Sequence, residues 1–148
     1  MTPNPILLVE DNDDDADLTV MAFNDAKIAN AIVRVRDGVE ALDYLFARGA
    51  YAGRRPEELP TVVLLDLNLP RIGGIEVLKQ IRANHLTKNQ PVVILTSSAE
   101  EQDRSAAYTH HANSYVRKPV DYDQFVAATR QLGLYWTVVN LPPPEPLA

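Results

Sequence analysis

The fold class is decided by one stretch, residues 61–74: Thr61-Val-Val-Leu-Leu-Asp66-Leu-Asn-Leu-Pro70-Arg-Ile-Gly-Gly74. An uninterrupted run of β-branched and aliphatic residues leads directly into the carboxylate of Asp66. Such a run is typical of a strand that is buried on both faces of a parallel sheet. Pro70 and the Gly73-Gly74 pair are expected to end the strand and turn the chain. Because ligands of open α/β sheets bind at the carboxyl ends of the strands, Asp66 is the first candidate for a functional residue.

The alternation of an apolar run with an amphipathic segment repeats along the chain. It predicts strands at 6–9, 31–35, 61–66, 91–96 and 113–116, and helices at about 13–27, 39–46, 75–84, 99–111 and 125–132. Five strands alternating with five helices indicate an α/β fold with a parallel sheet covered on both faces. Right-handed crossovers favour the flavodoxin-like, doubly wound (βα)5 arrangement with strand order 2-1-3-4-5. Its switch point lies between the first and third strands, which places Glu10 and Asp11 beside Asp66.

Length and composition fit one globular domain, with 148 residues, 46% hydrophobic and 23% charged. The absence of cysteine excludes disulfides, thiolate metal sites and cysteine nucleophiles. The net charge of −6 argues against nucleic acid as a partner. We find neither a membrane-spanning run nor a secretory signal, so we expect a cytoplasmic protein without a membrane partner. We divide the chain into a domain at 1–134 and a C-terminal extension at 135–148, which starts apolar and becomes Pro-rich.

Polar side chains follow four of the predicted strands at the same edge of the sheet. They are Glu10, Asp11, Asp66, Thr96 and Lys118. Crowded carboxylates repel one another, and a hard divalent ion such as Mg²⁺ relieves that repulsion. A carboxylate is also a nucleophile that forms an aspartyl phosphate, and Lys118 offers a positive charge for a phosphoryl oxygen. Each residue alone more often caps a helix or occupies a turn, but the conjunction of all five is hard to obtain by chance.

The motifs that carry these residues resemble the receiver domain of two-component response regulators. The resemblance covers residues 6 to about 133 and rests on Leu-Val-Glu10-Asp11, Leu-Leu-Asp66-Leu-Asn-Leu-Pro, Ile-Leu-Thr96-Ser-Ser and Tyr115-Val-Arg-Lys118-Pro. The spacings are similar too, with 30 residues from Asp66 to Thr96 and 22 from Thr96 to Lys118.

The resemblance implies a phosphoryl-accepting site that uses Mg²⁺ as its cofactor. Asp66 would accept the phosphoryl group from a histidine kinase, and Lys118 would contact a phosphoryl oxygen. Glu10, Asp11, Asp66 and the backbone carbonyl of Asn68 would hold the Mg²⁺. The protein would then catalyse only its own phosphoryl transfer and dephosphorylation, and would not be an enzyme that acts on other substrates.

The resemblance also implies a switch that reads the phosphoryl group. The hydroxyl of Thr96 would move toward the phosphate, and the ring of Tyr115 would swing inward behind it. The sequence offers no room for an output domain after the fifth helix, so output would be a protein contact or relay to a histidine phosphotransfer protein. These two outputs stay open.

Two residues depart from the receiver pattern. Glu10 stands where Asp is commoner, and Gly73 stands where an Asp usually precedes the glycine of the third helix. We expect the second departure to affect the loop after Asp66 and not the chemistry.

A narrower resemblance is to the small receivers that are paired with bacterial phytochromes. It rests on the wording Asp66-Leu-Asn-Leu-Pro, on the loop that contains Tyr51 and Arg54-Arg55-Pro56, and on the tail that begins near Trp136. This resemblance implies a photoreceptor histidine kinase as the donor. It also implies a homodimer formed through the side of helix four, strand five and helix five, together with the tail.

Two other functions and one simpler reading stand beside these expectations. A haloacid-dehalogenase-type phosphohydrolase also uses Asp, Mg²⁺, Thr or Ser and Lys, but it expects a second Asp where this chain has Asn68. A flavodoxin-like nucleotide-binding module expects a Gly-rich loop after the first strand, where this chain has Glu10-Asp11. The acids from Asp13 to Asp17 are most simply the capped, solvated start of a helix.

Overall fold

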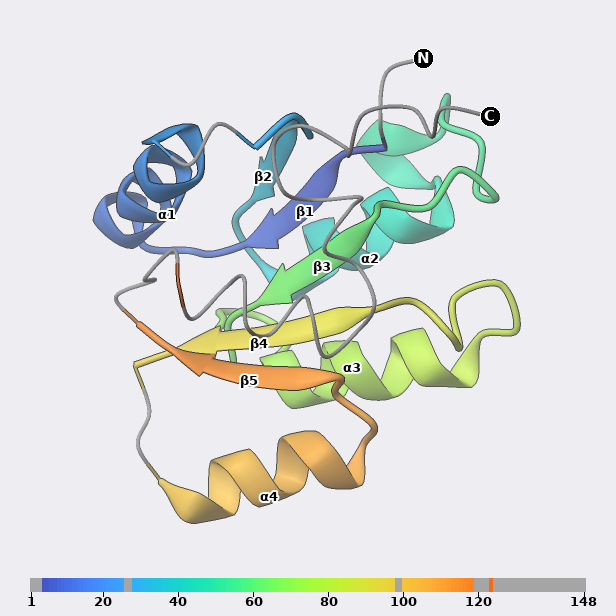
Figure 1. The fold of residues 1–148 in the computed structure, drawn as a ribbon. Helices are drawn as coiled ribbons and strands as arrows, with labels where there is room; N and C mark the ends of the chain where they lie inside the picture. Colours follow the sequence, from blue (N-terminus) through green and yellow to red (C-terminus); the bar gives the residue numbers. More distant parts are fainter. Residues whose placement is uncertain (1–3, 26–27, 98–99, 119–122, 124–148) are drawn as a thin grey trace, which may run out of the picture.

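The computed structural model describes residues 4–25, 28–97, 100–118 and 123. They form a five-stranded parallel sheet in the order β2-β1-β3-β4-β5, which confirms the predicted fold class and strand order (Figure 1). The strands are β1 (Ile6–Val9), β2 (Ile32–Val35), β3 (Val62–Leu65), β4 (Val92–Thr96) and β5 (Ser114–Arg117). Parallel pairing brings the carboxyl ends of these strands to one edge, where the arrowheads of β1, β3, β4 and β5 lie in Figure 1.

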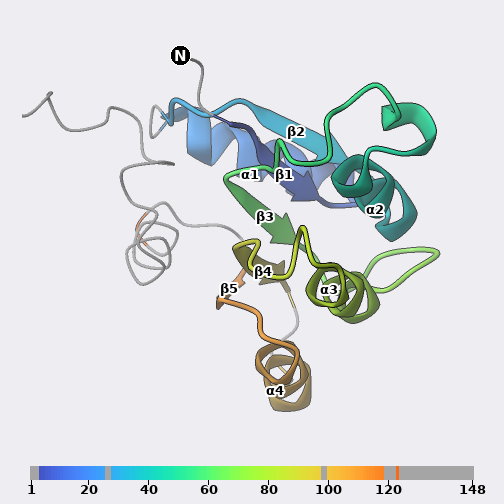
Figure 2. The same ribbon diagram turned by 90° about the vertical axis from the view of Figure 1, so that its right-hand side faces the viewer.

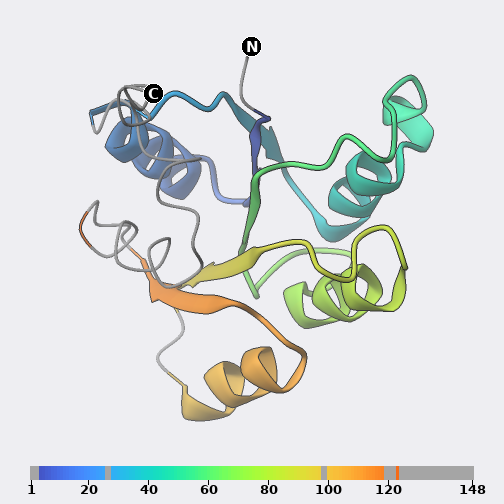
Figure 3. The same ribbon diagram turned by 45° about the vertical axis from the view of Figure 1, so that its right-hand side comes forward.

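Helices cover both faces of the sheet. They are α1 (Asp13–Asp25), α2 (Gly38–Phe46), α3 (Gly74–Ala83) and α4 (Glu101–Thr109), with a short 3₁₀ turn at Gly49–Tyr51. Helix α1 lies on one face, and α2 and α3 lie on the other (Figures 2 and 3). Within the described residues, no helix has the length and apolar character needed to cross a membrane. The predicted helix at 125–132 and the extension at 135–148 lie outside the described residues.

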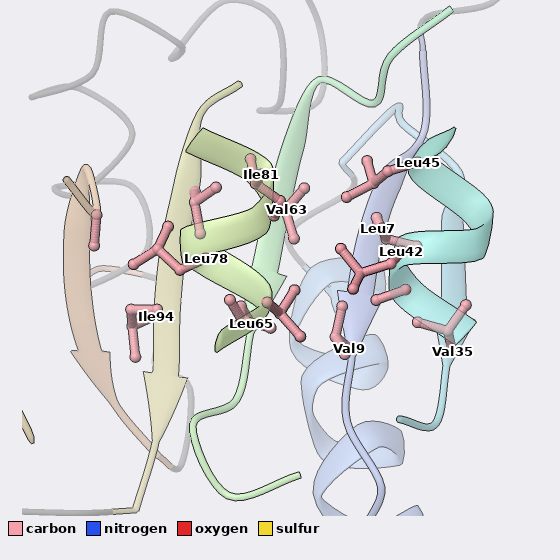
Figure 4. Packing of buried hydrophobic residues seen from close by; sticks show 14 of the residues in the cluster. Leu7, Val9, Val35, Leu42, Leu45, Val63, Leu65, Leu78, Ile81 and Ile94 are labelled. Carbon is pink, nitrogen blue, oxygen red and sulfur yellow. The ribbon is translucent and has the colours of Figure 1, made fainter. Parts of the chain in front are cut away.

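The apolar runs of the sequence become the three central strands, each buried on both faces. No residue of β1, β3 or β4 exposes more than 1% of its surface, and most of them expose none. Alternate residues enter two separate cores, so Leu7 faces α2 and α3 while Leu8 faces α1. Figure 4 shows the first core, where Leu42 of α2 and Leu78 of α3 pack against the sheet. A strand with helices on both sides needs apolar residues at every position, which explains the uninterrupted runs.

The long loop before β3 is attached to α2 by two of its side chains, those of Arg54 and Tyr51. The guanidinium of Arg54 lies 3.9 Å from the centre of the Tyr44 ring. The same group donates hydrogen bonds to the backbone carbonyls of Tyr44 and Glu58. Tyr51 packs edge-on against Tyr44, and its hydroxyl donates to Glu40 over 2.8 Å. The loop is therefore held in place by contacts that its composition did not reveal.

The turn between β3 and α3 assigns separate roles to Arg71, Gly73 and Gly74. Its left-handed residue is Arg71, with φ of 70°, whereas Gly73 has φ of −69° and precedes α3. Gly74 is needed for space instead. A Cβ atom there would lie 2.7 Å from the Cα of Leu67 and still closer to the carbonyl oxygen of Asp66. The absence of a side chain at Gly74 thus lets α3 begin directly against the backbone of the candidate residue.

We expect Gly74→Ala to destabilise the protein by about 3 kcal/mol, because the added methyl group must displace backbone atoms of Asp66 and Leu67. Chemical denaturation measures this change. Gly53→Ala is the matched control, since a Cβ at Gly53 meets no atom within 4 Å, and its effect should stay within about 1 kcal/mol of zero. Equal stability of the two variants would contradict the packing argument.

Candidate functional site

The register of the parallel strands brings Glu10 and Asp66 side by side. Val9 of β1 is paired with Leu65 of β3, so the residues that follow the two strands are Glu10 and Asp66. The pairing continues past the strands, because the N–H of Asp66 donates to the carbonyl of Val9 over 3.1 Å. Both residues are buried, with 1% of Glu10 and 4% of Asp66 exposed. Two acidic side chains therefore share a poorly hydrated space at the carboxyl edge of the sheet.

Arg34 of β2 fixes the start of this acidic segment. Its Nε and Nη2 atoms donate to the backbone carbonyl of Glu10 over 3.0 and 2.8 Å. Its Nη1 atom contacts Asp13 over 2.8 Å, and Arg36 contacts the same carboxylate over 2.6 Å. The Arg34 and Arg36 guanidinium groups hold the pKa of the Asp13 carboxyl below its usual value. One edge strand thus anchors both the end of β1 and the first turn of α1.

Lys118 is the cation at the centre of the site. The backbone N–H of Lys118, the residue after β5, donates to the carbonyl of Thr96 over 2.9 Å. Its ammonium contacts Glu10 Oε1 at 2.5 Å, Asp66 Oδ2 at 2.9 Å and Asp15 Oδ2 at 2.9 Å. Only 8% of the Lys118 side chain is exposed. A single ammonium therefore binds three carboxylates that come from three separate segments.

The crowding shifts the pKa values of both Glu10 and Lys118. The pKa of Glu10 is raised to about 7, chiefly because the carboxyl is buried. The hydrogen bond from Lys118 lowers this pKa, and the neighbouring Asp66 raises it, so burial remains the main cause of the shift. Burial alone would lower the pKa of Lys118, but the carboxylates of Glu10, Asp66 and Asp15 outweigh this effect and raise it. The lysine is therefore firmly protonated, and the carboxylate that resists ionisation is Glu10.

Three acids of the site fit a divalent cation. One oxygen from each of Glu10, Asp11 and Asp66 lies within 4.8 Å of the others. Asp11 is exposed, while the other two acids are buried, so the group opens to solvent on one side. Carboxylate oxygens are the ligands that Mg²⁺ takes in proteins, usually one or two together with water. The donor set therefore suits a hard cation.

The remaining predicted residues surround this group at different distances. The N–H of Asn68 donates to Asp66 Oδ1 over 3.0 Å, so the turn after β3 orients the carboxylate. Thr96, with none of its surface exposed, closes β4 next to Lys118. Tyr115 is paired with Ile94 and therefore lies on the same face of the sheet as Thr96. Its side chain packs with the core on the α2 and α3 side. Two residues, Val116 and Arg117, separate it from Lys118 along the chain.

Asp15 is a member of the site that the sequence did not single out. The simplest interpretation placed it with its neighbours in a solvated helix start, and Asp14 and Asp17 are indeed exposed. The structure turns Asp15 toward Lys118 instead, with 39% of its side chain exposed. No feature of the sequence distinguishes Asp15 within this acidic run, because the contact depends on how α1 meets the end of β5.

Residues 6–130 match the family of the response regulator receiver domain. This match spans most of the chain, and the chain therefore belongs to that family. Among curated relatives, the chain is 41% identical to a probable methanogenesis regulatory protein, FilR2 of Methanothrix harundinacea, over 95% of this chain and 88% of the relative. It is 36% identical to the response regulator Rcp1 of Synechocystis, over 95% and 94%.

Solved structures of related proteins include several phytochrome response regulators. The bacteriophytochrome response regulator RtBRR is 48% identical, covers 96% of this chain and 85% of its own, and superposes with a TM-score of 0.84. The Mn²⁺-bound form of Rcp1 is 35% identical, with coverages of 91% and 95% and a TM-score of 0.74. The phosphorylated cyanobacterial phytochrome response regulator RcpA is 36% identical, with coverages of 90% and 94% and a TM-score of 0.74. The predicted family resemblance is confirmed, including its likeness to regulators paired with phytochromes.

The raised pKa of Glu10 predicts an unusual dependence of stability on pH. Between pH 4.5 and about 7 the folded protein holds a proton on Glu10 that the unfolded chain has lost. The contribution of Glu10 to stability is thus complete below pH 4.5 and is lost as the pH rises to 7, by up to about 3 kcal/mol. With Mg²⁺ removed by a chelator, the unfolding free energy of wild type should fall relative to that of Glu10→Gln between pH 5 and 8. Denaturant titrations at both pH values measure this difference.

Glu101→Gln serves as the control, because Glu101 is exposed in the first turn of α4. Its difference from wild type should stay constant with pH. The same constant difference for Glu10→Gln would show that the Glu10 carboxyl ionises as it does in the unfolded chain.

Proposed function

We propose that this chain is a phosphorylation-dependent signalling switch in which Asp66 accepts a phosphoryl group from a histidine kinase in a Mg²⁺-dependent reaction. The observation that carries this proposal is the ammonium of Lys118, held 2.9 Å from Asp66 Oδ2 beside the three acids that fit a cation. The family match and the likeness to a regulator solved in its phosphorylated form support it.

Asp66 is the nucleophile in this proposal. One of its carboxylate oxygens forms a bond to phosphorus while the bond from phosphorus to the donor nitrogen of the kinase histidine breaks. The N–H of Asn68 and the ammonium of Lys118 each contact one oxygen of the carboxylate. These two contacts restrict the rotation of the side chain, so its oxygens face a defined direction before the donor arrives.

Charge neutralisation is the main catalytic requirement, because the phosphoryl group enters a site that is already rich in carboxylates. Glu10, Asp11, Asp66 and the backbone carbonyl of Asn68 would hold Mg²⁺, which when bound neutralises charge on the phosphoryl oxygens. The Mn²⁺-bound form of Rcp1 supports a divalent cation in this class of site. Lys118 would turn from the carboxylates to a phosphoryl oxygen and so retain a negative partner throughout.

The output in this proposal is a change of protein surface. The phosphoryl group adds acceptor oxygens within reach of the end of β4, where the buried hydroxyl of Thr96 donates to them. Movement of Thr96 leaves room behind it for the ring of Tyr115 on the same sheet face. The face of β5 and α4 would then change its contacts with partners. The protein catalyses only its own phosphoryl transfer and dephosphorylation in this scheme.

The partners are inferred from the relatives. The likeness to RtBRR supports a phytochrome-type histidine kinase as the donor. We place the protein in the cytoplasm as part of the same proposal. The proposal includes a homodimer formed through the side of α4 and β5 with the following helix and tail. Its output is a protein contact or relay of the phosphoryl group to a histidine phosphotransfer protein. The helix and tail in that dimer lie outside the described residues.

Acetyl phosphate with Mg²⁺ should add one phosphoryl group to the wild-type protein, because the site itself activates Asp66. Intact mass spectrometry measures the adduct. Asp66→Asn should show none, and chelation of Mg²⁺ should reduce the wild-type adduct at least about tenfold. Glu76→Gln, an exposed substitution on α3, is the control that should behave as wild type.

Failure of the wild type to form an adduct would overturn the proposal. Continuous release of inorganic phosphate from phosphate esters, without an adduct, would instead establish the haloacid-dehalogenase-type hydrolase.

A phytochrome histidine kinase that carries labelled phosphate on its histidine should transfer it to the wild-type chain and not to Asp66→Asn. Transfer should outpace that from a histidine kinase without a photoreceptor domain at equal concentration, because docking surfaces set the rate between partners. Gel autoradiography over time measures both rates. Equal rates from the two kinases would remove the phytochrome pairing and leave the receiver function intact.

A further inference from the structure

Lys118 has three carboxylate partners, and one of them stands apart from the others. Glu10 and Asp66 belong to the group of acids that fits a cation, and their side chains are 2% and 6% exposed. Asp15 is outside that group, and its side chain is 39% exposed. It nevertheless lies as close to the ammonium as Asp66 does, at 2.9 Å. Among the three carboxylates that contact Lys118, Asp15 is therefore the one that does not belong to the group of acids that fits a cation.

The position of Asp15 is fixed by the first turn of α1. Its backbone N–H donates to the side chain of Asn12 over 2.9 Å, which caps the helix. Its carbonyl accepts a hydrogen bond from the hydroxyl of Thr19 over 3.0 Å. The side chain thus extends from an anchored backbone toward the end of β5. Its neighbour Asp14 carries the same charge in the same turn and remains exposed.

We propose that Asp15 is a positioning residue for Lys118. When Glu10 and Asp66 bind Mg²⁺, the Asp15 carboxylate keeps the Lys118 ammonium in the site and thereby favours Mg²⁺ binding. This inference rests on the proposed function, because it concerns the same cation site. It assigns a role to a residue of α1 beyond the acids at the ends of the strands.

The physical reason is a competition between two kinds of cation for the same carboxylates. Glu10 and Asp66 cannot give their oxygens fully to a divalent ion while both still bind the ammonium. If the Lys118 ammonium left Glu10 and Asp66 and had no other partner, it would be an unpaired charge with only 8% of its side chain exposed to water. Asp15 supplies the remaining partner, so Lys118 stays charged, paired and close to Asp66. Without the Asp15 charge, the Lys118 ammonium competes more strongly with Mg²⁺ for the carboxylates of Glu10 and Asp66.

The experiment measures the dissociation constant for Mg²⁺ alone, by calorimetric titration of the full chain at fixed pH and ionic strength. Asp15→Asn should weaken Mg²⁺ binding about fivefold relative to wild type. Asp14→Asn, which removes the same charge one position away, should stay within about twofold. Asp15→Glu should recover most of the affinity, because a carboxylate on a longer side chain still reaches the ammonium.

A double-mutant cycle distinguishes action through Lys118 from a general effect of charge. In the Lys118→Ala background, Asp15→Asn should change Mg²⁺ affinity by less than about twofold, since the competing ammonium is gone. An undiminished fivefold loss in that background would overturn the proposal. So would equal losses for Asp15→Asn and Asp14→Asn in the otherwise wild-type protein.

These outcomes are separable from those of the proposed function. A wild type that binds Mg²⁺ and forms the acetyl phosphate adduct, with an Asp15→Asn variant of unchanged Mg²⁺ affinity, would remove only the role of Asp15. A wild type that binds no Mg²⁺ would overturn both the cation site and the role of Asp15.

Discussion

The repulsion between two buried carboxylates is the constraint on which the rest of this site depends. The pairing of β1 with β3 places Glu10 and Asp66 next to each other. Both are almost completely shielded from water, so their charges are compensated within the protein. The structure meets this need with one ammonium, with backbone N–H groups on Glu10 and Asp66, and with Arg34 on the carbonyl of Glu10. The raised pKa of Glu10 shows that this compensation is incomplete.

The same compensation ties the site to the completion of the fold. Lys118 is 108 residues from Glu10, 103 from Asp15 and 52 from Asp66 along the chain. The ammonium reaches all three only after β5 has docked beside β4 at the far side of the sheet from β2. Crowded acids therefore remain uncompensated until the sheet is assembled. A site in which a single ammonium faces several carboxylates is also well suited to receive a divalent cation.

Much of this arrangement follows from patterns that are local in the sequence. Continuous apolar runs predicted the central strands because a strand covered by helices on both faces has no polar side. The βα alternation predicted the strand order, and the order predicted that Glu10 and Asp11 would lie beside Asp66. The glycine pair after Asp66 was assigned to the turn, but Arg71 adopts the left-handed conformation and Gly74 provides space for α3. Local composition indicates where a turn occurs, whereas the packing around it decides which residue carries which role.

The sequence by itself determined the fold class, the edge of the sheet at which the site lies and the side chains that the strand ends deliver there. It did so because burial and backbone periodicity are imposed residue by residue along the chain. The tertiary structure alone decided which acid in the first turn of α1 contacts Lys118. Asp13 pairs with Arg34 and Arg36, Asp14 stays in solvent, and Asp15 meets the ammonium. These contacts depend on the orientation of α1 against β2 and β5, which is set by packing between segments far apart in the sequence.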